Sequence, residues 1–143
     1  MVEAKVNWID GERFIAQASS GHAFVVDSDR QRNTAPGPME LVLVGLCGCT
    51  ATDVVVILRK KREPVEAVEV RAEAERATEP PTVYTSIKLI YTVTGAVSRK
   101  AVEDAVRLSE EKYCGASAML RKTAKIVTEV HVVDSKVASI TAK

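Results

Sequence analysis

The sequence predicts one α+β domain in which antiparallel sheets surround a long central apolar helix. Three observations predict this class: strand-like alternation in both halves of the chain, an apolar stretch too long to be one strand, and strand patterns segregated from helix patterns. The length of 143 residues suits one domain, and no shift in composition marks a second. We therefore expect residues 1–143 to form a single domain.

The first part of the chain alternates short apolar and polar runs, which are broken at Asp10-Gly11 and Ser20-Gly21. This pattern predicts two or three antiparallel strands joined by tight turns within residues 2–26. Residues 27–38 are polar and rich in turn-forming residues, which predicts a loop. Pro38 suits the first turn of a following helix, because the backbone N–H that proline lacks would have no intrahelical partner there.

A helix is predicted from about Met39 to about Arg62, with Asp53 as its only charge between Glu40 and Arg59. Its length could cross a bilayer, but a central aspartate costs about 2.5 to 3.5 kcal/mol there, so we expect no membrane span. A soluble helix that is apolar nearly all round must be covered on every side. One small sheet covers only one face, so we expect a second subunit to supply the rest in an obligate dimer.

The second half of the chain begins with a regular alternation after Pro64 and a turn at residues 79–81, which together predict a long hairpin. Ser98 suits the N-cap of a helix that Cys114-Gly115 ends, and the last ten residues are expected to be a frayed tail. The expected elements are strands over about residues 68–75 and 83–93, helices over about 99–113 and 117–124, and a strand over about 126–133.

Charge and composition argue against several classes of function. Lysine plus arginine number 20 against 19 for aspartate plus glutamate, so no net basic field favours nucleic acid or an anionic membrane. The basic runs at 59–62 and 122–125 are interpreted as solvated helix ends. The start of the chain has no basic leader followed by an apolar block, so we expect a cytoplasmic protein whose three cysteines are reduced.

The cysteines leave several kinds of chemistry to weigh. The glycines around Cys47 and Cys49 lack the lysine and hydroxyl signature of a phosphate loop. These two cysteines, Cys114 and a histidine could bind a metal, but C-x-C on a helix directs its sulfurs about 200° apart, so we expect no metal. His22 and His131 are interpreted as ordinary turn and sheet residues, although either could pair with a thiol.

Thiol redox chemistry is the remaining possibility. A reactive cysteine needs a lowered pKa and a second thiol within reach to resolve its sulfenic acid. Cys49 and Cys114 are 65 residues apart, each beside a helix break, and a disulfide would require Cα atoms within about 4.4 to 6.8 Å. The alternative is that each cysteine is a small buried hydrophobic residue.

Two stretches, APGPMELVLVGLCGCTATDVVVILRKKR and AVRLSEEKYCGASAML, resemble the two cysteine motifs of the OsmC/Ohr superfamily, especially its OsmC-like branch. The resemblance implies an intertwined homodimer with active sites at its interface, and a thiol-dependent peroxidase that reduces organic hydroperoxides without a cofactor. By position, Cys49 would be the peroxidatic thiol and Cys114 the resolving thiol, with Cys47 a packed bystander. A lipoyl or thioredoxin-like dithiol would then reduce the disulfide.

The residues that would activate Cys49 depart from the family pattern. Family peroxidases carry a glutamate ten residues before the reactive cysteine, where this chain has Met39, and the acidic residue is Glu40. On an unbroken helix Glu40 and Cys49 lie about 180° apart, so the resemblance requires a bend or the other subunit. Arg13 is the expected cation partner, ahead of Arg30 and Arg32.

The second motif also departs from the family, because Gly115 stands where proline usually follows the cysteine. The apolar side chains of Leu46 and Val42, on the helical side of Cys49, would favour lipid-like peroxides. The alternative function is a non-catalytic OsmC-like protein that binds an apolar ligand or senses redox state.

Overall fold

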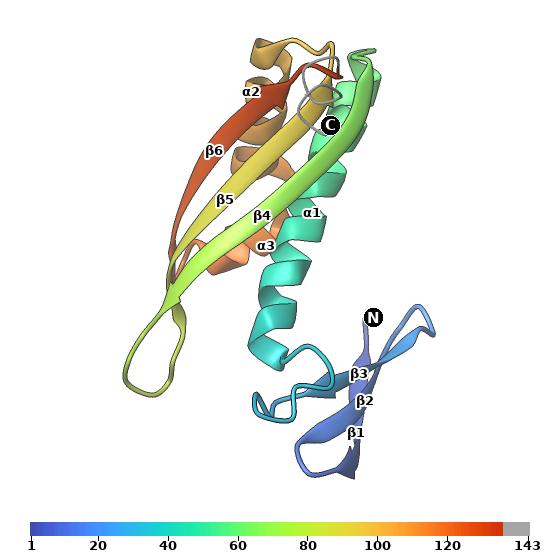
Figure 1. Ribbon diagram of the computed structural model, residues 1–143, viewed down its shortest axis with the longest axis vertical. Coiled ribbons are helices and arrows are strands. Elements are labelled where there is room, and N and C mark those ends of the chain that lie inside the picture. Colours follow the sequence, from blue (N-terminus) through green and yellow to red (C-terminus); the bar gives the residue numbers. More distant parts are fainter. Residues whose placement is uncertain (136–143) are drawn as a thin grey trace. The chain divides into compact units, whose positions relative to one another are not determined.

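The structure, a computed structural model, describes residues 1–135 (Figure 1). The frayed tail expected for the last ten residues therefore lies outside the described range, apart from its first two positions. The chain divides into two compact units, residues 1–44 and residues 45 onward, and α1 (Pro38–Lys60) contributes to both. The α+β class predicted from the sequence is confirmed, with two small sheets and a long helix.

The first unit contains a three-stranded antiparallel sheet with the order β1-β2-β3, as the turn pattern predicts. Its strands are β1 (Ala4–Asp10), β2 (Arg13–Ala18) and β3 (Ala23–Asp27). Gly11 and Gly21 in the two turns adopt φ values of +47° and +87°, which glycine reaches without a steric penalty. Most of the sheet is exposed, and β1 has no buried residue.

Helix α1 starts at Pro38, one residue before the predicted Met39, and ends in Arg59 and Lys60, whose charges complement the negative end of the helix dipole. Four of its 23 residues are buried, and their spacing of four places them in one stripe: Leu46, Thr50, Val54 and Leu58. Within the described residues, α1 is the one helix long and apolar enough to cross a membrane. A core helix of a soluble protein passes the same test, so this finding does not indicate a membrane protein.

The second unit contains the sheet β4-β5-β6, formed by β4 (Val65–Arg76), β5 (Tyr84–Gly95) and β6 (Lys125–Val133). The predicted hairpin is confirmed, because β4 and β5 pair antiparallel. The expectation of antiparallel sheets is wrong for the last pair, since β6 runs parallel to β5. Residues 96–124 return the chain to the start of β5, and a crossover of that length suits parallel pairing.

The crossover between β5 and β6 consists of α2 (Arg99–Leu108), η1 (Ser109–Tyr113) and α3 (Gly115–Leu120). The predicted cap is confirmed, because Ala101 N–H donates to Ser98 Oγ at 3.2 Å. The single helix expected to Tyr113 is wrong in its last turn, where the chain adopts π-helical hydrogen bonding over η1. This change of pitch comes directly before Cys114, and such turns recur at functional sites.

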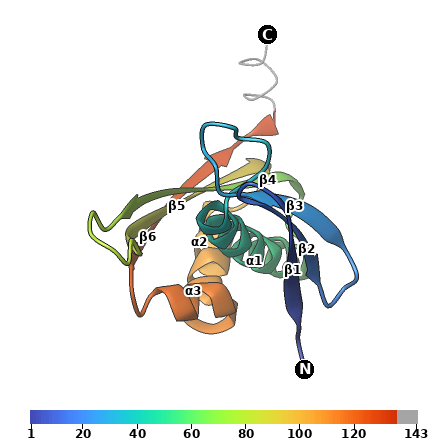
Figure 2. The ribbon, with the colours of Figure 1, turned by 90° about the horizontal axis from the view of Figure 1, so that it is seen from below.

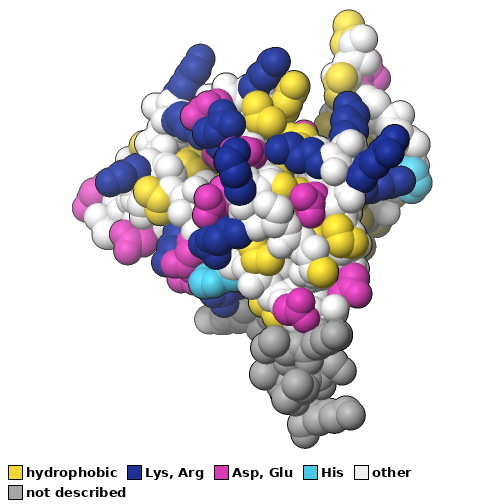
Figure 3. All heavy atoms as spheres, turned by 90° about the horizontal axis from the view of Figure 1, so that it is seen from above, with side chains coloured by type: hydrophobic (Ala, Val, Ile, Leu, Met, Phe, Trp, Pro, Cys, Tyr) yellow, Lys and Arg dark blue, Asp and Glu magenta, His cyan; other side chains and the backbone are white. Residues whose placement is uncertain are grey.

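Helices α2 and α3 and the second-unit part of α1 lie on one face of the β4-β5-β6 sheet (Figure 2). Strand β5 is the most buried, and Leu89, Tyr91 and Val93 are fully enclosed against these helices. On the face shown in Figure 3, basic and acidic side chains are interspersed, in keeping with the near balance of charge in the sequence. The core that positions the thiols is therefore built from β5 and the surrounding helices.

Candidate active site

The structure brings Cys49 and Cys114 together. Cys49 lies on α1 and is partly exposed, whereas Cys114 is 3% exposed and precedes α3. The Cys49 side chain lies within hydrogen-bonding reach of the Cys114 thiol. Burial raises the pKa of the Cys114 thiol above its ordinary value, hydrogen bonding with the side chain and N–H of Ser117 lowers it, and the nearby Cys49 raises it again. The site thus contains one accessible thiol facing one enclosed thiol.

The turn η1 determines where Cys114 lies. The Cys114 N–H donates to the Ser109 carbonyl at 2.8 Å, a bond that spans five residues instead of the usual four. Cys114 itself is extended, with φ −76° and ψ 104°, and forms the N-cap of α3. Its sulfur accepts from the Ser117 N–H at 3.3 Å. The break predicted at Cys114-Gly115 is therefore present, but it is a helix start as well as a helix end.

A buried chain of hydroxyl groups lies beside the two thiols. Thr50 Oγ1 is 2.7 Å from Tyr91 Oη and 2.8 Å from Ser109 Oγ, and Ser109 Oγ donates to Asp53 Oδ2 at 2.8 Å. Burial raises the pKa of Tyr91 far above its ordinary value, so this hydroxyl remains protonated. The hydrogen bonds connect α1, β5 and η1. They hold together the elements that carry Cys49 and the turn before Cys114.

Glu110 connects the same region to α3. Its side chain is 9% exposed and forms an ion pair with Arg121 at 2.7 Å. Arg121 also donates to the Glu110 carbonyl at 2.8 Å. The Glu110 carboxylate accepts from Ser117 Oγ at 2.8 Å and from Tyr91 Oη at 3.3 Å. A carboxylate with these partners is fully engaged, as a buried charge must be.

Sequence reasoning did not identify the polar residues of this region as site residues: Thr50, Tyr91, Ser109, Glu110 and Ser117. A signal for two of them was present, since Ser109 and Glu110 lie in the LSEEKYC segment that carries the resemblance. Their mutual contacts depend on η1 and on the position of β5, neither of which has a local sequence signature.

The other two predicted residues, Glu40 and Arg13, belong to the first unit and do not pair. Glu40 Oε1 lies 2.6 Å from Arg30 Nη1 and accepts the Gly37 N–H at 3.0 Å. Arg13 instead contacts Asp10 at 3.6 Å. Within this chain Glu40 is therefore paired with Arg30, the next candidate after Arg13.

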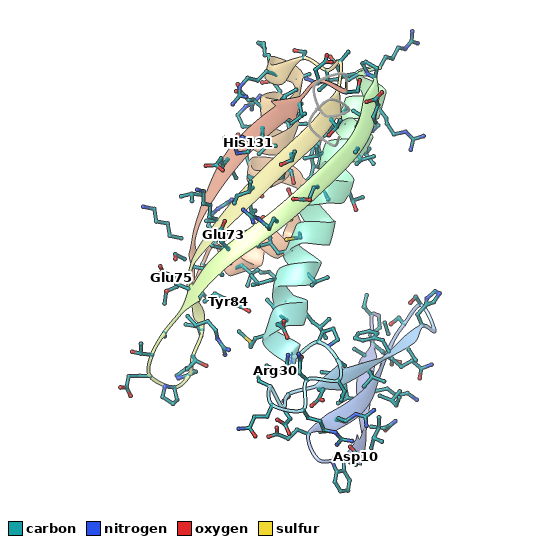
Figure 4. All side chains as sticks on the ribbon, in the orientation of Figure 1. Asp10, Arg30, Glu73, Glu75, Tyr84 and His131 are labelled. Atoms are coloured by element: carbon teal, nitrogen blue, oxygen red, sulfur yellow. The ribbon has the colours of Figure 1, made fainter. Side chains whose placement is uncertain are left out.

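The loop that carries Arg30 runs directly into α1, and this brings Arg30 close to Glu40 (Figure 4). Its guanidinium donates to the Ala35 carbonyl at 3.0 Å and also contacts the carbonyl of Asp27. These bonds hold Arg30 beside the first turn of α1, where Glu40 lies. Arg32, the third candidate, contacts Asp10 at 3.0 Å.

Cys47 faces a different direction from Cys49, as their spacing on a helix requires. Its thiol contacts the backbone of Ala72 on β4, and burial raises its pKa above the ordinary value. Among residues 1–135 no group of three or more His, Cys, Asp or Glu side chains could hold a metal ion. His22 contacts Ser20 and His131 contacts Glu129, and both rings are exposed.

A hollow of about 380 Å³ opens beside the buried polar chain in the second unit. It is bordered by α1 and by the region of α2 and η1, and its lining residues are Asp53, Val56, Ile57, Lys60, Lys61, Leu108 and Tyr113. Tyr113 directly precedes Cys114, and Asp53 is the end of the hydroxyl chain. Of the residues predicted to make an apolar setting for Cys49, Leu46 is fully buried and Val42 is 37% exposed.

Comparison with known proteins identifies relatives over most of the chain. The OsmC-like protein family matches residues 31–129. Protein YhfA of Escherichia coli (strain K12) is 41% identical over 133 residues, which cover 92% of this chain and 98% of YhfA.

Solved structures agree with this relationship. A hypothetical protein from Aquifex aeolicus VF5 is 30% identical with a TM-score of 0.86, covering 94% of this chain and 98% of that one. The organic hydroperoxide resistance protein OsmC from Legionella pneumophila is 19% identical with a TM-score of 0.70, covering 92% of this chain and 97% of that one. At that identity the likeness concerns the fold alone.

Proposed function

This chain belongs to the OsmC-like protein family, and on that premise we propose that it is a thiol-dependent peroxidase that reduces organic hydroperoxides. The observation that carries the proposal is the contact between the Cys49 and Cys114 thiols. Two thiols from distant parts of the chain meet, one accessible and one enclosed. That arrangement suits a cysteine that meets the oxidant and a second cysteine that resolves it.

The proposed reaction has three steps. The Cys49 thiolate attacks the distal oxygen of ROOH, the O–O bond breaks, and the alcohol leaves as Cys49 becomes a sulfenic acid. Cys114 then attacks the Cys49 sulfur, forming a disulfide as the sulfenic oxygen leaves in water. An external dithiol, lipoyl or thioredoxin-like, reduces the disulfide by exchange and is itself oxidised. No metal or organic cofactor takes part in these steps.

The preference for organic peroxides is proposed from the surroundings of the thiols. Leu46 is buried one helical turn before Thr50, and Val56, Ile57 and Leu108 form the apolar part of the hollow that Tyr113, the residue before Cys114, also lines. An alkyl group gains free energy by leaving water for such walls, at about 25 cal/mol per Å² of apolar surface, whereas hydrogen peroxide does not. For the charged pair of the first unit we propose Arg30 with Glu40, in place of Arg13 with Glu40.

We further propose that the active form is a homodimer in the cytoplasm, where thiols stay reduced. On α1, Val44 is 61% exposed and Val56 is 42% exposed, although the helix carries few polar side chains. On β1, Trp8 is 69% exposed. Exposed apolar side chains of this number favour an interface with another copy of the chain.

The test is turnover of cumene hydroperoxide with a dithiol reductant. Cys49→Ser should abolish turnover, and Cys114→Ser should consume about one equivalent of peroxide and then stop, because its sulfenic acid has no partner. Cys47→Ser is the matched control and should keep its activity. Peptide mass after one equivalent should show a Cys49–Cys114 bond. Full turnover by the Cys49→Ser variant would refute the proposal.

The alternative is a non-catalytic protein that binds an apolar ligand or senses redox state. Met39 and Gly115 favour it, because both stand where the family peroxidases carry other residues. A wild-type chain that consumes no peroxide and releases a tightly bound apolar ligand without cysteine chemistry would establish this alternative.

A further inference from the structure

The side chain of Ser117 lies between the enclosed thiol and a carboxylate. Its hydroxyl is hydrogen-bonded to the Cys114 side chain, and it donates to Glu110 Oε1 at 2.8 Å. Ser117 is fully buried, and its N–H donates to the same sulfur at 3.3 Å. Thiol, hydroxyl and carboxylate therefore form one continuous chain of hydrogen bonds.

These hydrogen bonds offer what the resolving step needs, an acceptor for the Cys114 proton. Cys114 is enclosed, so a thiolate there is poorly solvated and the sulfur is protonated before it attacks. A neutral thiol is a weak nucleophile, and general bases that take such a proton contribute about 10² to 10⁴-fold in rate. Solvent has little access to a residue that is 3% exposed. An internal group can take this proton instead of solvent.

From this geometry we propose that Ser117 relays the Cys114 proton to Glu110 while Cys114 attacks Cys49. The inference rests on the proposed peroxidase function for its physiological setting. Ser117 is the catalytic residue, because it touches the reacting thiol, and Glu110 is a positioning residue and proton acceptor that acts through it.

The atoms and electrons balance in this step. The Cys114 S–H bond breaks as its proton moves to Ser117 Oγ, and the hydroxyl proton of Ser117 moves to Glu110. The new S–S bond forms as the Cys49 S–O bond breaks, so the Cys114 sulfur is oxidised and the Cys49 sulfur is reduced. The departing hydroxide takes the proton that Glu110 has accepted and leaves as water, so Glu110 is again a carboxylate and no proton is gained or lost. The step needs no further reactant.

The groups around Glu110 support the role. Arg121 bonds both to its carboxylate and to its backbone carbonyl, so the acceptor oxygen is held in one orientation. Tyr91 contacts the same oxygen as Ser117, at 3.3 Å. Tyr91 also bonds to Thr50, the residue that follows Cys49. Hydrogen bonds therefore connect Glu110 to the segments that carry both thiols.

The experiment measures closure of the disulfide without peroxide. In a Cys47→Ala background, Cys49 is converted to a mixed disulfide with dithiobis(nitrobenzoate), and attack by Cys114 releases the coloured aromatic thiolate. Release is followed by stopped-flow absorbance between about pH 6 and pH 8. Ser117→Ala and Glu110→Gln remove the relay and the acceptor. Glu111→Gln is the matched control, because this adjacent glutamate is exposed and contacts Arg107.

We expect Ser117→Ala and Glu110→Gln to slow closure by about 10²-fold near neutral pH. Closure should depend weakly on pH in the parent and rise about tenfold per pH unit in both variants, since only thiolate formed by solvent can then attack. Glu111→Gln should match the parent. Equal rates in all proteins would overturn the relay, and so would slowing that is the same at every pH.

Failure of the relay and failure of the peroxidase proposal give different results. The parent protein could fail to consume cumene hydroperoxide and still form the Cys49–Cys114 disulfide more slowly in the Ser117→Ala and Glu110→Gln variants. In that case the relay stands and the peroxidase proposal is wrong. If peroxide turnover depends on Cys49 but both variants form the disulfide at the parent rate, the relay alone is wrong. If one variant does not fold, the other still decides the question.

Discussion

The two sheets of this protein have the same number of strands but differ in how they are covered. In the second, β5 is buried along most of its length, with Leu89, Tyr91 and Val93 fully enclosed. In the first, β1 has no buried residue, and Trp8 and Phe24 are exposed. The buried side chains of the first unit are a carboxylate, Asp27, and two small apolar residues, Ala16 and Val26, instead of a cluster of large apolar side chains.

The difference shows which sheet is a self-sufficient core. The second sheet has helices of its own chain on one face, so its apolar side chains are buried without help (Figure 2). The first sheet presents apolar side chains to solvent, and a stable protein seldom leaves so many uncovered. A second copy of the chain is the cover that we propose.

The largest expected effect is on the core of the second sheet. Leu89→Ala should lower the free energy of unfolding by about 2 to 5 kcal/mol, because it deletes a fully buried side chain from a packed core. The comparison is Ile15→Ala on the middle strand of the first sheet, where the side chain is 40% exposed and about 1 kcal/mol or less is expected. Urea unfolding at low protein concentration measures both, and equal losses would contradict the contrast between the sheets.

The next effect concerns the proposed dimer. Trp8→Ala should weaken dimerisation by about 2 kcal/mol, or about 30-fold in the dissociation constant, because exposed tryptophans often dominate an interface. Analytical ultracentrifugation over a dilution series measures the constant. Lys5→Ala, at a position of opposite orientation on β1, is the control. A wild-type chain that stays monomeric at every concentration would rule out the dimer.

The smallest effect is on acid stability in the first unit. The hydrogen bond from Thr34 lowers the pKa of Asp27 to about 2, although burial opposes the shift. Because the pKa is lower in the folded chain, the stabilisation is present above the ordinary aspartate pKa and is lost as the pH falls from about 4 to about 2. Asp27→Asn should flatten the unfolding curve in that window. An unchanged pH dependence in the variant would show that Asp27 is not responsible.

Much of the fold followed from local patterns in the sequence. Alternation predicted β4 and β5, the turn glycines predicted the first sheet, and Pro38 and Ser98 marked two helix starts. These features depend on neighbours within a few residues, which the sequence displays directly. The pairing direction of β6 could not be predicted in the same way, because it depends on where a crossover returns the chain.

Some features of the candidate site could likewise be predicted from the sequence, and others depend on the folded structure. The sequence was sufficient to name Cys49 and Cys114 as candidates, because two separated motifs resemble one family. Only the folded chain brought their sulfurs together, paired Glu40 with Arg30, and placed Ser117 between a thiol and Glu110. The physical reason is range: strand and helix propensities act between near neighbours, whereas a partner for a buried charge or thiol is chosen by packing of distant segments.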